Sequence, residues 1–123
     1  MAVGVGTGLL MGLWAFDGPM AVPEWLGPYD SVARRLARLG HIAFIGLGIL
    51  DVLIAREIPR LALSAALRRT ASLAMIFGNV LLPPALFAAA ACRPCKYLLP
   101  PPAIAVFVAL VLTAWGVWGA KDE

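Results

Sequence analysis

The chain has 123 residues, of which 62% are hydrophobic and 14% are charged, and its formal net charge is +3. This composition excludes a soluble enzyme, because the apolar stretches leave nothing large enough to form a soluble domain. The positive charge does not indicate binding to nucleic acid, because the basic residues flank apolar stretches, where cations anchor to lipid headgroups.

Apolar stretches cover most of the chain, at residues 2–16, 39–55, 72–91 and 102–120. A membrane-spanning helix needs about 20 mainly apolar residues. The pattern therefore predicts an all-α integral membrane protein, a bundle of four transmembrane helices that forms a single domain over residues 1–123. The first stretch lacks the basic beginning and the small-residue cleavage site of a signal peptide, so we expect it to remain in the protein.

The first apolar stretch carries Gly4, Gly8 and Gly12 at intervals of four residues, which places them on one face of a helix. In a lipid bilayer, helices associate through close packing over small residues. We therefore predict that these glycines form a packing face. The sequence leaves open whether the helix packed there belongs to this chain or to another subunit.

The segment after the first stretch, residues 17–30, contains three prolines and two glycines, which excludes a regular helix. We predict an irregular loop at the membrane surface. Asp30 or Ser31 then suits the N-cap of a second helix, which we expect to run to about residue 55.

On the second apolar stretch, His41, Gly48 and Asp51 fall on a single stripe of the helix surface. Ionisable side chains within a membrane usually face protein or a water-filled cavity, so we predict that this stripe is buried against protein. For Asp51 we expect an ion pair with Arg56 or Arg69, and the alternative is a role in a proton path.

Residues 57–70 join the second and third stretches. Pro59 stands near the start of this segment, and Arg60, Ser64 and Arg68 follow one helical turn apart. This spacing predicts a short interfacial helix with a polar face, whose basic residues suit an anionic membrane surface.

The third apolar stretch contains Asn79 and the adjacent Pro83 and Pro84. Prolines inside a helix remove backbone hydrogen bonds and free the carbonyl groups one turn earlier. We predict a kink near the middle of the membrane, with the Asn79 amide satisfying part of the lost bonding.

Cys92 and Cys95 form a C-x-x-C motif, which occurs in dithiol redox centres, in metal sites and at covalent haem attachment. Haem attachment requires a histidine next, and Lys96 stands there instead. We favour unreactive thiols or a structural disulfide, with redox activity and metal ligation as the open alternatives. Zinc ligation would recruit His41, because the start of the second helix and the end of the third lie on the same membrane side.

Four spanning helices with one C-x-x-C pair resemble the disulfide-generating quinone reductases of bacterial membranes. Those enzymes need a second cysteine pair to pass electrons onward, whereas this chain has only Cys92 and Cys95. The motif therefore does not place the chain in that family.

His41 is the only histidine, so a haem held by two histidines of this chain is excluded. We expect His41 to have a hydrogen-bonded structural role. The alternatives are a contact to another subunit or its pigment, and ligation of a cofactor. By default, we expect this chain to bind no cofactor alone.

The sequence contains no self-sufficient catalytic signature, and we predict a non-catalytic accessory subunit of a larger bacterial membrane complex for respiratory or photosynthetic electron transfer. Its partners would be other membrane subunits, lipids, and pigments or haem held by a neighbour. One alternative is a membrane thiol-disulfide oxidoreductase or cofactor-binding subunit that uses Cys92, Cys95 and His41. A second alternative is a small transporter that uses Asp51 and Asn79.

The orientation in the membrane rests on the first loop. Lys and Arg residues divide equally between the two sides of the predicted bundle, so the positive-inside rule does not decide. Asp17, Glu24 and Asp30 follow the first helix, whereas its leading end carries only the α-amino group. We therefore expect both termini in the cytoplasm and the chain in the bacterial inner membrane.

Overall fold

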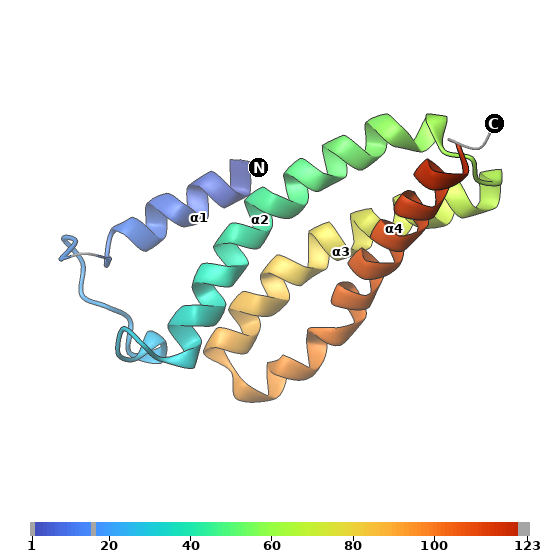
Figure 1. Cartoon of the computed structure of the whole chain (residues 1–123). Helices are drawn as coiled ribbons and strands as arrows, with labels where there is room; N and C mark the ends of the chain where they lie inside the picture. Colours follow the sequence, from blue (N-terminus) through green and yellow to red (C-terminus); the bar gives the residue numbers. More distant parts are fainter. Residues whose placement is uncertain (1, 16, 121–123) are drawn as a thin grey trace.

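The computed structural model describes residues 2–15 and 17–120, and within these ranges it contains helices and no strand (Figure 1). The elements, in chain order, are α1 Ala2–Gly12, η1 Glu24–Leu26, α2 Val32–Glu57, η2 Ile58–Arg60, α3 Ala65–Ala91, η3 Arg93–Leu98 and α4 Pro100–Gly119, where η marks a 3-10 helix. The predicted all-α class is confirmed.

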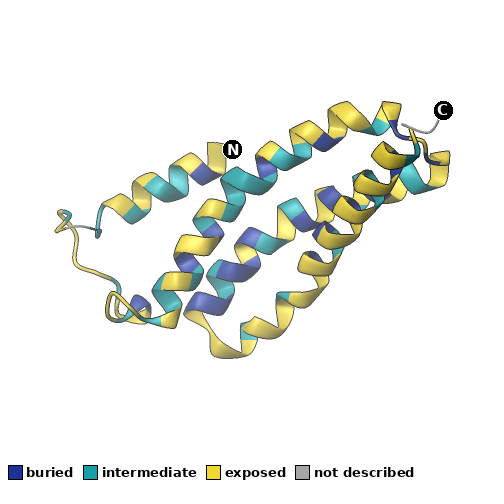
Figure 2. Ribbon diagram, in the orientation of Figure 1, coloured by how far each residue is buried: buried dark blue, intermediate teal, exposed yellow. Residues whose placement is uncertain are grey.

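Three segments are long and apolar enough to cross a membrane: Val32–Arg60, Ala65–Ala91 and Arg93–Gly119. Helix α3 lies between α2 and α4 and runs antiparallel to both of them (Figure 1). Burial is concentrated along α3, whereas α4 exposes most of its surface (Figure 2). These helices indicate a membrane protein, as the sequence predicts.

Close contact between the long helices depends on two glycines that the sequence analysis did not single out. A Cβ at Gly40 of α2 would lie 2.9 Å from the ring of Phe87 and 3.2 Å from the carbonyl oxygen of Pro83, both on α3. A Cβ at Gly78 of α3 would overlap the side chain of Val106 on α4. Each glycine thus lets a neighbouring helix approach the backbone, the kind of packing that membrane helices use.

The fourth spanning helix is not confirmed, because α1 is short. Its 11 residues rise about 16 Å, roughly half of a hydrocarbon core that is about 30 Å thick. Gly4 lies against Ile45, near the middle of α2, so α1 covers only the half of α2 that follows the first loop (Figure 1). Phe16, which ends the predicted stretch, lies outside the described residues.

The end of α1 has a local cause. The N–H groups of Leu13 and Trp14 donate to carbonyls three residues back, at 3.1 and 3.4 Å, which tightens the last turn. Asp17 then takes a positive φ of 61°, a conformation that does not continue a right-handed helix. The apolar composition continues beyond the helix, so composition alone overstates its length.

The expected separate interfacial helix over residues 57–70 is not present. Glu57 still belongs to α2, η2 contains three residues, and α3 already begins at Ala65. The reason is the cap: the Ser64 hydroxyl accepts from the N–H of Leu67 at 3.3 Å and starts a helix that continues without interruption into the third span.

The predicted cap of the second helix is confirmed at Ser31, whose hydroxyl accepts from the N–H of Arg34 at 3.2 Å. From there α2 continues for 26 residues. Residues 17–31 form an irregular connection apart from η1, in agreement with the predicted loop. Helix α3 also continues through Pro83 and Pro84, which lie inside it.

Candidate functional site

The contact between α1 and α2 is made at two of the three predicted glycines. A Cβ at Gly4 would lie 2.6 Å from Ile45 Cγ1, and a Cβ at Gly8 would lie 2.6 Å from His41 Cε1. At Gly12 an added Cβ meets no atom within 4 Å. The helix packed on α1 therefore belongs to this chain at Gly4 and Gly8, and Gly12 stands outside the contact.

His41 reaches across this contact to α1. Its Nδ1 lies 3.2 Å from the hydroxyl oxygen of Thr7, and that hydroxyl donates its own proton to the carbonyl of Gly4 at 2.9 Å. With the hydroxyl proton directed to Gly4, the Thr7 oxygen is placed to accept from His41 Nδ1–H. His41 thus has a polar partner within the chain, on α1.

Asp51 bonds to α3. The Asn79 amide nitrogen donates to Asp51 Oδ2 at 3.2 Å, and both side chains are half-buried. The expected ion pair with Arg56 or Arg69 is not present among the described residues, where the ion pair formed is Arg60 with Glu57. Arg56 is turned about 140° around the helix from Asp51, and Arg69 lies about 15 Å before Asn79 along α3.

The predicted stripe of α2 is divided between two helix contacts. His41 faces α1 and Asp51 faces α3, so the two ionisable groups serve different helix contacts and do not meet in one interior. Gly48, between them in sequence, is buried. The Asn79 amide is directed to Asp51 and not to the carbonyls freed by the prolines of its own helix.

Cys92 and Cys95 lie where α3 ends and η3 follows, and both are free thiols. The N–H of Cys95 donates to the carbonyl of Cys92 at 2.9 Å, so the two residues stand one turn apart; Cys92 is exposed and Cys95 is half-buried. Over residues 2–15 and 17–120, no three His, Cys, Asp or Glu side chains group as metal ligands. The structure does not bring His41 to the thiols.

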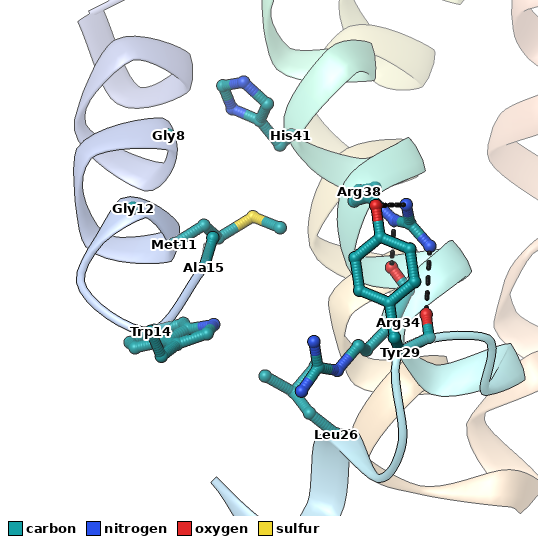
Figure 3. A pocket seen from close by; sticks show the side chains of 10 residues that line it. All are labelled: Gly8, Met11, Gly12, Trp14, Ala15, Leu26, Tyr29, Arg34, Arg38 and His41. Atoms are coloured by element: carbon teal, nitrogen blue, oxygen red, sulfur yellow. Dashed lines mark hydrogen bonds between the residues drawn. The ribbon is translucent and has the colours of Figure 1, made fainter. Parts of the chain in front are cut away.

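A pocket of about 270 Å³ lies beside His41, between the end of α1, the first loop and the first turns of α2 (Figure 3). Its apolar walls include Met11, Trp14 and Leu26, and Leu26 is almost fully buried. The complete lining is Gly8, Met11, Gly12, Trp14, Ala15, Leu26, Tyr29, Arg34, Arg38 and His41. Most of these residues were not predicted as a site.

Two arginines of α2 fasten the loop that closes the pocket. Arg34 Nε donates to the carbonyl of Gly27 at 3.0 Å. Arg38 donates to the carbonyl of Tyr29 at 3.3 Å and to its hydroxyl at 3.5 Å (Figure 3). Both guanidinium groups also lie over the Tyr29 ring, 5.8 and 4.9 Å from its centre. The loop is thereby held against the first turns of α2.

One feature of the sequence could have indicated the basic side of this pocket. Arg34, Arg38 and His41 follow the i, i+4, i+7 spacing of one helix face. That face is basic within a largely apolar helix, which distinguishes it from an ordinary lipid-facing surface. Its apolar counterpart on α1 and in the loop becomes apparent only once the three segments are folded together.

Comparisons with protein-family models, with curated proteins and with solved structures give no match for this chain. The features that can bear on function are those of the structure itself: the hydrogen bonds of His41 and Asp51 between helices, the pair of thiols, and the pocket with its two arginines.

Proposed function

We propose that this chain is a non-catalytic accessory subunit of a larger bacterial membrane complex, one that carries out respiratory or photosynthetic electron transfer. The observation that supports this role most is the use of the polar groups within the apolar helices. His41 bonds to Thr7 and Asp51 bonds to Asn79, so each links α2 to a neighbouring helix. Hydrogen bonds of this kind, between side chains of neighbouring helices, stabilise a helix bundle.

The outer face of α1 supports the same role. Val3, Val5, Leu9 and Leu10 are each more than half exposed, on a helix that packs chiefly against α2 (Figure 2). We propose that α1 lies in the membrane as the fourth helix of the bundle and that a helix of another subunit covers this face. Lipids, and pigments or haem held by that neighbour, would complete the surroundings.

For the orientation, we propose that η2 and the C-terminal end of α4 face the cytoplasm of a bacterial inner membrane. The first loop and η3 then face the opposite side. This choice rests on the acidic residues of the loop, Asp17, Glu24 and Asp30, because the Lys and Arg counts on the two sides are equal. Because α1 begins beside the middle of α2, the proposed orientation does not include the expected cytoplasmic N-terminus.

The role as a subunit is tested by purifying the tagged chain from its native membranes in a mild detergent. We expect other membrane chains to co-purify in fixed proportion. An absorption spectrum of the same sample would report pigment or haem, and we expect any such signal to belong to a partner. Recovery of the chain alone, under conditions that keep other complexes of that membrane intact, would contradict the proposal.

A second candidate is a membrane thiol-disulfide oxidoreductase, favoured by the placement of Cys92 and Cys95 one turn apart at an exposed helix end. We expect the double variant Cys92→Ser with Cys95→Ser to keep its partners and its function, because the thiols make no helix-to-helix bond that the structure assigns. An assembled double variant that loses thiol-dependent turnover would favour the oxidoreductase, since the thiolate is the reactive species.

A further inference from the structure

We propose that the pocket beside His41 binds an anionic phospholipid, with the phosphate at Arg34 and Arg38 and an acyl chain against Met11 and Trp14. This inference concerns a site that the accessory role does not require, and it stands without that role. It rests on the charge at one end of the pocket, the apolar walls beside it, and the depth at which each lies in the membrane.

The charge at the pocket is uncompensated. Arg34 and Arg38 lie over one tyrosine ring, and within the described residues neither forms an ion pair with a carboxylate. Arg34 uses only Nε for its bond to the loop, so both of its terminal nitrogens remain as donors. Two adjacent guanidinium groups repel one another, and a phosphate between them would accept charge-assisted hydrogen bonds from both.

The remaining walls suit a hydrocarbon chain. Met11, Trp14 and Leu26 present side chains of the kind that exclude water, and Gly12 adds no side chain of its own (Figure 3). The pocket, at about 270 Å³, is smaller than most small-molecule sites, which range from about 300 to 1,000 Å³. It therefore holds the glycerol region and part of one chain, and the rest of the lipid extends into the bilayer.

The depth of these groups matches a lipid. Arg34 lies in the first turn of α2, next to the loop, whereas His41 lies about 10 Å further along the helix. The arginines are thus at the level of the headgroups and the apolar walls run inward from them. Basic pockets between membrane helices on the cytoplasmic side bind anionic headgroups, and we propose the same recognition for this pocket on the side of the first loop.

Trp14 provides a direct probe, because it lines the pocket. A variant with Trp25→Phe, Trp115→Phe and Trp118→Phe retains Trp14 as its only tryptophan. It is placed in phosphatidylcholine vesicles that contain a small fraction of brominated phosphatidylglycerol or, in a parallel sample, the same fraction of brominated phosphatidylcholine. Bromine quenches tryptophan only at short range, so quenching reports which lipid lies beside Trp14.

We expect brominated phosphatidylglycerol to be enriched about fivefold over brominated phosphatidylcholine next to Trp14, which corresponds to ~1 kcal/mol and agrees with the magnitude for a basic residue near an anionic membrane. Arg34→Gln with Arg38→Gln removes both guanidinium groups of the pocket and should abolish the enrichment, so that the two brominated lipids quench Trp14 equally. Arg35→Gln is the matched control, because Arg35 is exposed and does not line the pocket. It should leave the enrichment unchanged.

Replacing Arg34 and Arg38 can also release the loop that they hold, so a second pair of variants tests the pocket with both arginines in place. Gly12→Leu fills the pocket, and a Cβ at Gly12 meets no atom within 4 Å, so the helix contact is preserved. Gly6→Leu is equally free of neighbours and lies outside the pocket. We expect Gly12→Leu to lower the enrichment and Gly6→Leu to leave it unchanged.

Two results would overturn the proposal. One is equal quenching of Trp14 by the two brominated lipids in the chain with its arginines intact. The other is displacement of brominated phosphatidylglycerol by inorganic phosphate as effectively as by unlabelled phosphatidylglycerol, which would show that the site binds the phosphate group without the chain. Displacement by unlabelled phosphatidylglycerol alone supports the lipid as the ligand.

Discussion

At the scale of single residues, the structure distinguishes side chains that hold helices together from those that only accompany them. Gly8 and Gly12 look equivalent in the sequence, yet Gly8 contacts His41 and Gly12 borders an open pocket. Asp51 and Asn79 lie 28 residues apart in the chain and bond directly. Each of these assignments can be tested by a variant with a matched control.

The first prediction concerns the contact of α1 with α2. Gly8→Leu should destabilise the fold by about 1–3 kcal/mol, the usual cost of forcing a large side chain into a packed site, because the added side chain meets the His41 ring. Gly6→Leu meets no neighbour and should change stability by less than about 0.5 kcal/mol. The measurement is the free energy of unfolding in detergent micelles. Equal losses for the two variants would remove Gly8 from the contact.

The second prediction concerns the bond between Asp51 and Asn79. Asn79→Ala should cost about 1 kcal/mol or somewhat more, the range measured for hydrogen bonds between membrane helices, because the Asp51 carboxylate loses its donor. Thr113→Ala is the control, since the Thr113 hydroxyl donates within its own helix, to Ala109 at 2.8 Å. A loss for Thr113→Ala as large as that for Asn79→Ala would argue against a special role of the helix-to-helix bond.

At the scale of the elements, caps and register decide what apolar composition leaves open. Ser64 starts α3 directly after a short connection, so Arg68 and Arg69 fall in the first turns of a spanning helix. The connection itself packs on α4, where the N–H of Ala62 donates to the carbonyl of Gly116 at 3.1 Å. This end of the bundle is therefore joined by a backbone hydrogen bond between the connection and α4, without a separate amphipathic helix.

The third prediction follows from this cap. Ser64→Ala should lower the unfolding free energy by about 1 kcal/mol, the typical cost of losing an N-cap, and should increase hydrogen exchange at the amides of the first turn of α3. Ser72→Ala, within the same helix, lacks a capping bond in the described structure and should have little effect. Unchanged exchange at the N–H of Leu67 in Ser64→Ala would show that the cap contributes nothing.

At the scale of the whole molecule, the sequence was sufficient for the helical class and for helices apolar enough to cross a membrane, because these depend on local composition. It narrowed the cap of α2 to Asp30 or Ser31, and the structure selects Ser31. The sequence was insufficient for the length of α1, which ends where the backbone at Leu13 and Trp14 tightens although the composition stays apolar. The partner of Asp51 depends on the register of two helices. The residues that line the pocket come from three separate segments, so no single stretch of the sequence predicts it.

We propose that the polar groups within the membrane helices, which form hydrogen bonds between helices, serve assembly and not chemistry. Replacing one member of a bonded pair leaves the other unsatisfied, whereas replacing both with apolar residues can be nearly neutral. The decisive variant is therefore Asp51→Leu combined with Asn79→Leu, which exchanges the bonded pair for an apolar contact.

The measurement compares this double variant with the unmodified chain in a strain that lacks the chain, and follows both the recovery of co-purifying subunits and the restoration of growth. We expect both to remain close to those of the unmodified chain, and we expect the single variant Asn79→Leu to recover fewer partners. A double variant that assembles with its partners in full amount and yet fails to restore growth would contradict the claim and would assign chemistry to Asp51 and Asn79.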